Sequence, residues 1–257
     1  MALFKGQNLE KIGPVRSSRH YFLDYALEND AIYVHYGWSP QAQYDISNLG
    51  VNNINGISES ESSFWRVKDK RAPHNVATST AKILSIAERK GYKTTSTKES
   101  VLKYVTDEVE LTDGQSAEKI TIPYSYSNDV EYTYDATTKR YQRYSKGVKE
   151  TDWSTGENIT TKNIIITFAK NSVLNDGENK DRQTLSNIGT LNGYYITNGK
   201  AIKITCEKTS RSAQTVYKDL DGNEIKVNDG NTYVQICPIN AKVTIEGAEE
   251  TVTEDVD

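Results

Sequence analysis

Long apolar runs and cysteines are both scarce in this sequence. No eighteen consecutive residues are apolar, and the first ten, MALFKGQNLE, lack the apolar core of a secretory signal. A membrane-spanning helix is therefore not expected, and the chain as written carries no signal. The two cysteines, Cys206 and Cys237, stand in separate strand-like runs without the spacing of a zinc site. A disulfide between neighbouring strands and two buried free thiols both fit this pattern.

A continuous basic stripe is also lacking. The net charge is −4, with 31 Lys and Arg against 35 Asp and Glu. Residues 1–91 hold 11 basic and 9 acidic side chains, a net charge of +2, whereas residues 92–257 hold 20 and 26, a net charge of −6. This distribution argues against binding to nucleic acid, which needs a basic surface. It favours a local site for an anion in the first part of the chain.

The first ninety residues alternate between strand-like and helix-like patterns. The run AIYVHYG at 31–37 is typical of a short strand, and a helix is predicted directly after it. Ser39 is the expected N-cap of that helix, Pro40 its first residue and Gly50 its C-terminal signal. His35 lies inside the strand-like run and is expected to be a core or edge residue.

Two further helices are predicted on either side of this strand and helix. The first is capped by Ser17 or Ser18 and runs to about Glu28. The third covers roughly 79–90 and closes with Lys90 and Gly91. Their expected inward faces consist of Phe22, Tyr25, Ala26 and Asn29 in the first helix and of Ile83, Leu84, Ile86 and Ala87 in the third.

The composition changes after Tyr92. A polar stretch precedes six strand-like runs that are rich in Ile, Val, Thr and Tyr and separated by NG and DG turns. The predicted fold is therefore α+β in two domains. Three helices pack on a small sheet in an N-terminal α/β domain at 1–92, and a polar linker with a short helix covers 93–118. A mostly antiparallel β domain follows at 119–247, and an acidic tail at 248–257.

Long stretches of the sequence resemble one known family. IGPVRSSRHYFLDYALENDAIYVHYGWSPQA at 12–42 and RAPHN at 71–75, with TKNIIITFA and DGNEIKVNDGNTYVQICP in the second part, are similar to the YerB-like family of bacterial lipoproteins. The resemblance implies two domains of unknown function in an extracytoplasmic protein that a lipid anchors to the membrane. The family's signal, its lipobox cysteine and the start of its first domain are absent ahead of ALFKG. Membrane attachment is expected only through that absent anchor.

Arg16 and Arg19 stand at the expected start of the first helix. Positive charge is unfavourable there, because a helix N-terminus carries about half a positive charge itself. An anion bound by both guanidinium groups and by free backbone N–H groups would explain the arrangement. Pairing of the arginines with structural carboxylates is the alternative.

The predicted anion site extends to the starts of the other two helices. Ligands of α/β sheets gather at the carboxyl ends of strands, where helices begin. The site is therefore predicted to include Ser17, Ser39, Arg71, His74 and Asn75 as well. His74 suits an acid–base role or an anion contact, although a structural hydrogen bond explains it equally. The three histidines have no nearby carboxylate or cysteine partners, so neither a metal nor a cofactor is expected.

These residues favour a binding protein over an enzyme, although catalysis stays open. The expected ligand is an anionic component of the cell envelope or an acidic segment of a protein partner. One alternative is an envelope hydrolase or transferase that acts on a phosphate ester or pyrophosphate, with His74 as acid and base. Another is an adaptor that joins other proteins, which would require an exposed apolar patch.

Overall fold

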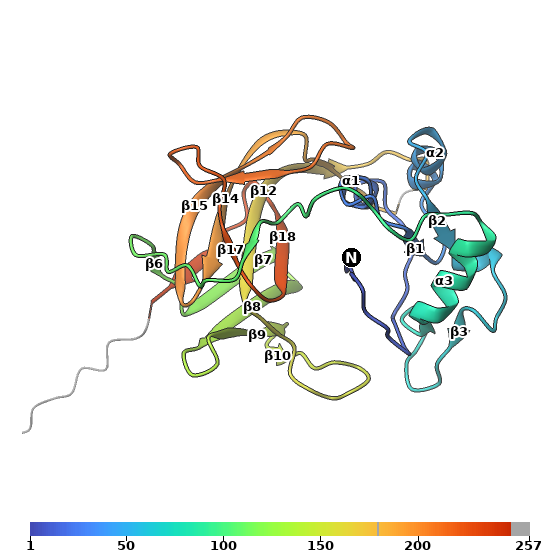
Figure 1. Ribbon diagram of the computed structural model, residues 1–257, viewed down its shortest axis with the longest axis horizontal. Coiled ribbons are helices and arrows are strands. Elements are labelled where there is room, and N and C mark those ends of the chain that lie inside the picture. Colours follow the sequence, from blue (N-terminus) through green and yellow to red (C-terminus); the bar gives the residue numbers. More distant parts are fainter. Residues whose placement is uncertain (179, 248–257) are drawn as a thin grey trace, which may run out of the picture. The chain divides into compact units, whose positions relative to one another are not determined.

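The computed structural model describes residues 1–178 and 180–247 (Figure 1). The chain has an α+β, sheet-rich fold in two compact units, each built from three chain segments. Unit 1 consists of Met1–Val101, Ser172–Ile188 and Lys208–Thr215, and the remaining segments form unit 2. The sequence analysis assigned the two later segments of unit 1 to the second domain. The predicted acidic tail at 248–257 lies outside the described residues.

Unit 1 contains the helices and several short strands. Its elements are α1 (Phe22–Glu28), β1 (Tyr33–His35), α2 (Pro40–Asn48), β2 (Asn53–Asn55), the 3-10 turn η1 (Gly56–Ser58), β3 (Trp65–Arg66), β4 (Val76–Ala77), α3 (Thr80–Arg89) and β13 (Gln183–Ser186). β1 and β2 pair in parallel, with Tyr33 opposite Asn53, and β3 pairs with β4 in antiparallel orientation. α1 packs against α2, and α3 packs against β2.

The N-cap serines and the C-terminal glycines of α2 and α3 have the roles that the sequence predicts. The Ser39 hydroxyl accepts from Ala42 N at 3.3 Å, and the Ser79 hydroxyl accepts from Lys82 N at the same distance. Each side chain thereby satisfies one of the free N–H groups of the first turn. Gly50 and Gly91 follow the helices with φ of +63° and +68°, the left-handed conformation that glycine adopts without strain.

The prediction that Leu84 of α3 faces the core is wrong. Ile86 and Ala87 are buried, but Leu84 is 45% exposed. Leu84 precedes Ile86 by two residues, and two residues of an α-helix are separated by about 200° around its axis. The two side chains therefore lie on nearly opposite faces, and only Ile86 reaches the core.

The predicted start of α1 is also wrong. The helix begins at Phe22, and its N-cap, Tyr21, makes no side-chain cap bond. Ser18 lies in extended backbone instead, where its N–H donates to Gly37 O at 2.9 Å and it pairs with Trp38 in a parallel bridge. A backbone contact distant in sequence thus takes the place of the cap. Arg16 and Arg19 consequently precede the helix, and the helix-dipole argument does not apply to them.

The buried face of α1 carries acidic side chains that the sequence analysis missed. Its buried residues are Leu23, Asp24, Ala26 and Glu28, and of the predicted inward face only Ala26 is among them. Glu28 Oε2 accepts from Lys208 Nζ at 2.7 Å, from Thr215 N at 3.1 Å and from Thr215 Oγ1 at 2.7 Å. The Glu28 and Lys208 side chains are only 4% and 3% exposed. Burial of this carboxylate requires these partners, because an unpaired buried charge is very unfavourable.

A half-buried arginine, Arg211, joins α1 to α2 through two buried carboxylates. Arg211 donates from Nε to Asp24 Oδ1 at 2.6 Å and from Nη1 to Asp45 Oδ2 at 2.7 Å. Its Nη2 donates to His20 O at 2.9 Å, and Asn187 Nδ2 donates to Asp24 Oδ2 at 3.0 Å. The two later segments of unit 1 therefore supply the partners of its buried carboxylates.

Unit 2 is a sheet-rich unit around an apolar core. Its principal strands are β7 (Lys119–Ser125), β8 (Asn128–Asp135), β9 (Arg140–Ser145), β12 (Asn163–Val173), β14 (Gly189–Thr197), β15 (Lys200–Lys208), β16 (Val216–Lys218) and β18 (Thr232–Pro238). Short strands complete it: β5 (Tyr104–Val105), β6 (Gln115–Ser116), β10 (Val148–Lys149), β11 (Thr160–Thr161), β17 (Val227–Asn228) and β19 (Thr244–Glu246).

The strands of unit 2 form two larger sheets and one small pair. The first sheet has the order β10-β9-β8-β7-β19, with β11 on β9. In the second, β14, β15 and β16 follow β12 in order, while β18 pairs with β12 in parallel (Figure 1). Most pairings are antiparallel, as predicted, and β12–β18 and β17–β5 are parallel. The core includes Tyr132, Tyr141, Ile164, Ile166 and Ile196.

Both cysteines are buried free thiols. Burial raises the pKa of each thiol to about 12, so neither is a reactive thiolate near neutral pH. Among the described residues, no helix has the length and apolar character needed to cross a bilayer, and the longest has ten residues.

Substitution of Lys208 by Met is expected to destabilise the protein strongly. The change leaves the Glu28 carboxylate buried without its cation, which costs about 3 kcal/mol. Lys180→Met is the control, because Lys180 pairs with Glu178 through side chains that are 63% and 41% exposed. Its loss should cost less than about 1 kcal/mol. The measurement is the free energy of unfolding in urea.

A double variant separates burial of charge from packing. Glu28→Gln combined with Lys208→Met removes both charges, so it should be more stable than Lys208→Met alone. Equal losses for Lys208→Met and Lys180→Met would contradict the role given to the buried pair.

Candidate functional site

The structure brings two of the predicted site residues into contact. Arg16 Nη1 lies 2.6 Å from His74 Nδ1, and both side chains are exposed. The same Nη1 lies 3.1 Å from His74 Nε2, and because a guanidinium has only N–H donors, the imidazole is the acceptor of this contact. The contact uses one of the five N–H groups of Arg16, which leaves the others for a ligand.

A second arginine is fixed beside this pair. Arg66 Nη1 donates to Asn75 Oδ1 at 2.8 Å, and the guanidinium carbon lies 5.6 Å from the centre of the Tyr36 ring. Tyr36 N in turn donates to Arg16 O at 2.9 Å, so the backbone at Arg16 runs next to Tyr36. These contacts gather cationic side chains from the segment before α1 and from the β3–β4 hairpin.

The turn that carries His74 adds a third arginine. His74 N donates to Arg71 O at 2.9 Å, which closes a turn between β3 and β4. The Arg71 side chain is exposed. We call Arg16, Arg66, Arg71 and His74 the basic face. None of its three guanidinium groups is paired with a carboxylate of the described residues.

The other predicted residues have local structural contacts. Arg19 Nη1 donates to Ser18 O at 2.9 Å and to Ser17 O at 3.5 Å, so it is held against its own backbone. The Ser17 hydroxyl donates to Tyr36 O at 3.3 Å. Ser39 is only 1% exposed, and its hydroxyl caps α2. The structure therefore does not bring all the predicted residues to one cleft.

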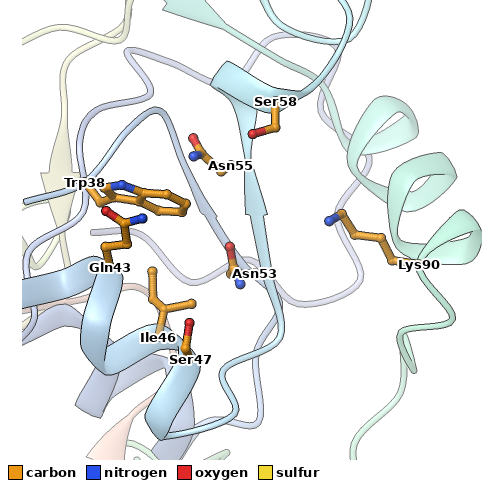
Figure 2. Close-up of a pocket in the computed structure, with 8 residues that line it drawn as sticks. All are labelled: Trp38, Gln43, Ile46, Ser47, Asn53, Asn55, Ser58 and Lys90. Atoms are coloured by element: carbon orange, nitrogen blue, oxygen red, sulfur yellow. The ribbon is translucent and has the colours of Figure 1, made fainter. Parts of the chain in front are cut away.

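A pocket opens in unit 1 at a place where no predicted site residue lies. Its volume is about 240 Å³. Asn53 and Asn55 face it from β2, because alternate residues of a strand share a face. Gln43, Ile46 and Ser47 face it from α2, where residues three and four apart are neighbours. Its other lining residues are Trp38, Ser58 and Lys90 (Figure 2).

The pocket adjoins the strand ends that the topological argument favours. Trp38 follows β1 and Ser58 follows β2, where ligands of parallel sheets gather. The sequence analysis selected residues by positive charge and therefore passed over these amides, hydroxyls and the indole. No group of three or more His, Cys, Asp or Glu side chains able to hold a metal occurs in the described part of the chain.

His35 lies behind the pocket and is fully buried, as expected of a core residue. Its Nδ1 lies 2.8 Å from Gly37 O, and its Nε2 lies 3.1 Å from Asn53 Oδ1. Both partners are oxygen acceptors, so a neutral ring donates to only one of them. Burial lowers the pKa of His35 below its usual 6.5, although both hydrogen bonds act in the opposite direction.

The lowered pKa of His35 predicts a loss of stability in acid. The unfolded chain binds a proton at His35 at a higher pH than the folded protein does, so stability is retained above pH 6.5 and falls as the pH drops below it. His20 acts in the same direction, because burial lowers its pKa as well.

The measurement is the free energy of unfolding between about pH 8 and pH 5. His35→Asn retains a donor for Gly37 O and should show a smaller loss in acid than the unmodified chain. Identical pH profiles for the two proteins would contradict the prediction.

Comparison with known proteins places these features in a family. Residues 1–93 match the model described as "Protein of unknown function (DUF3048) N-terminal domain", and residues 120–234 match that of the corresponding C-terminal domain. The chain is 30% identical over 246 residues to "Putative lipoprotein YerB" of Bacillus subtilis, which covers 93% of this chain and 70% of the relative.

A solved structure agrees with this relationship. The crystal structure of the Bacillus subtilis YerB protein matches with a TM-score of 0.80 at 30% identity, over 94% of this chain and 80% of the other. The match extends over both units, and the sequence similarity covers most of the chain. The protein therefore belongs to the DUF3048 family of YerB-like proteins.

Proposed function

We propose that this protein is an extracytoplasmic binding protein that holds an anionic group on its basic face. The basic face supports the proposal because Arg16 contacts the imidazole of His74 instead of an acid. Structural arginines are commonly satisfied by carboxylates, and the described residues provide none for Arg16, Arg66 or Arg71. Their remaining N–H groups suit the oxygens of a phosphate or carboxylate.

The arrangement of Arg66 adds to the case for a prepared site. Its contact with Asn75 and its position over the Tyr36 ring restrict the guanidinium before any ligand arrives. A restricted side chain loses less conformational entropy on binding than a mobile one. Exposed charges attract an anion from solution, and this attraction weakens as salt screens it.

The location outside the cytoplasm rests on family similarity. The Bacillus subtilis relative is described as a lipoprotein, and this chain is similar to it over most of its length. A lipid anchor would place the basic face where it meets anionic components of the cell envelope or an acidic segment of a partner protein. We propose no metal or cofactor for this binding.

Replacement of Arg16 by Gln is expected to weaken phosphate binding about tenfold. Hydrogen bonds to charged groups contribute about 1.5 kcal/mol or more, and a tenfold change in Kd corresponds to about 1.4 kcal/mol. The measurement is calorimetric titration of the full chain with inorganic phosphate at low ionic strength. Raised salt should weaken the binding of the unmodified protein.

Lys82→Gln provides the control for net charge, because Lys82 is an exposed residue of α3 outside the basic face. It should bind phosphate as the unmodified protein does. Absence of phosphate binding, or equal weakening by Arg16→Gln and Lys82→Gln, would contradict the proposed function.

A further inference from the structure

The pocket between α2 and β2 has an apolar wall of the kind that supports a flat ligand. The half-buried indole of Trp38 lies above Gln43 and Ile46 (Figure 2). Its backbone pairs with Ser18, and its ring lies 5.5 Å from that of His35. An aromatic side chain restricted in this way offers apolar area at little cost in entropy.

Fixed amide groups surround this wall. Asn55 Oδ1 accepts from Gly37 N at 2.9 Å and from Ile57 N at 3.2 Å, so its orientation is set by the backbone. Its Nδ2 has no partner in the described part of the chain and is left as a donor. Asn53 is held by His35 and by Val51 O. Together with Gln43, Ser47 and Ser58, these groups offer donors and acceptors around the apolar wall.

The charge of the lining residues is positive. Lys90 is the one charged side chain among the eight residues that line the pocket, and Figure 2 shows its ammonium group pointing toward the pocket from the end of α3. No carboxylate lines the pocket to compete for it. The exposed Lys90 ammonium lies 5.9 Å from the centre of the Tyr92 ring, and a ligand with an acidic group would add an ion pair to this contact.

The size of the pocket limits the ligand to one ring. A volume of about 240 Å³ corresponds to about eight water molecules at roughly 30 Å³ each. It is below the roughly 300–1,000 Å³ of pockets for drug-sized ligands.

We infer that this pocket binds a single sugar ring that carries a carboxylate or phosphate. The C–H face of the ring would lie on Trp38, its hydroxyls would bond to Asn55 and Gln43, and its acidic group would pair with Lys90. The site is separate from the basic face, because the two share no residue. It therefore goes beyond the proposed function and can fail or succeed independently.

The test is a titration of the full chain followed by tryptophan fluorescence. The ligands are glucuronate, a glucose phosphate, glucose, which lacks the acidic group, and acetate and inorganic phosphate, which lack the ring. Both acidic sugars should give a saturable change with a Kd of about 1 mM, and glucose should bind several times more weakly. Trp38→Phe should remove the change, because the other tryptophans, Trp65 and Trp153, do not line the pocket.

Four further variants assign the parts of the site. Lys90→Gln should reduce the affinity for glucuronate about fivefold, to that for glucose, while Lys82→Gln on the same helix should leave both unchanged. Asn55→Asp retains the acceptor for Gly37 N and Ile57 N but replaces the free donor by a negative charge, so it should abolish binding of the acidic sugars. Arg16→Gln should have no effect. Circular dichroism checks that each variant is folded.

Several results would overturn the inference. They are the absence of a saturable signal, a signal that persists in Trp38→Phe, and equal affinity for glucose and glucuronate. A Trp38-dependent signal that acetate or inorganic phosphate gives with the same affinity as the corresponding acidic sugar would show a simple anion site in the pocket. Loss of the signal in Arg16→Gln would assign it to the basic face, and would leave the phosphate titration of the proposed function as a separate result.

Discussion

Buried ion pairs between distant parts of the sequence are the interactions on which unit 1 depends. Glu28 is paired with Lys208, and Asp24 and Asp45 are both paired with Arg211. An isolated carboxylate in a protein interior is costly, whereas a paired and hydrogen-bonded one is tolerated. The helices α1 and α2 can therefore bury these faces only when the segment at 208–215 supplies its cations.

Both candidate sites also depend on the fold of unit 1, because the basic face and the pocket lie on the two sides of the backbone at residues 35–38. The alternation of side chains along a strand directs His35 to the pocket side and Tyr36 to the basic face. Between Tyr36 and Trp38, Gly37 adopts a φ of +79°, and an added Cβ would lie 3.0 Å from the Ile57 side chain. The Gly37 peptide groups accept from Ser18 and His35 and donate to Asn55.

Local signals predicted much of the fold but not the partners of its charges. Ser39 and Ser79 cap helices because each side chain reaches an N–H three residues away. By contrast, Glu28 is 180 residues from Lys208 in the sequence. Periodic patterns report only on neighbouring residues, so they do not predict a partner at that separation. The prediction of where α1 begins was wrong for the same reason, because Ser18 forms a bridge with Trp38, a residue outside the helix. The parallel β12–β18 pairing is likewise set by tertiary contacts.

The candidate sites likewise were predicted in part from the sequence and in part not. Positive charge identified Arg16 and His74, which the structure brings into contact, but it also selected Arg19 and Ser39, whose side chains satisfy the backbone. The pocket was missed because amides and an indole carry no charge signal, and because only the fold places Lys90 beside β2.

The dependence of unit 1 on its later segments is tested most directly by the amide NMR spectrum of residues 1–101 alone, compared with that of the full chain. Without Lys208 and Arg211, the peptide should give the narrow signal dispersion of an unfolded chain. A dispersed spectrum that reproduces the full chain's shifts for α1 and α2 would show that these helices fold without their cations, and would contradict the account.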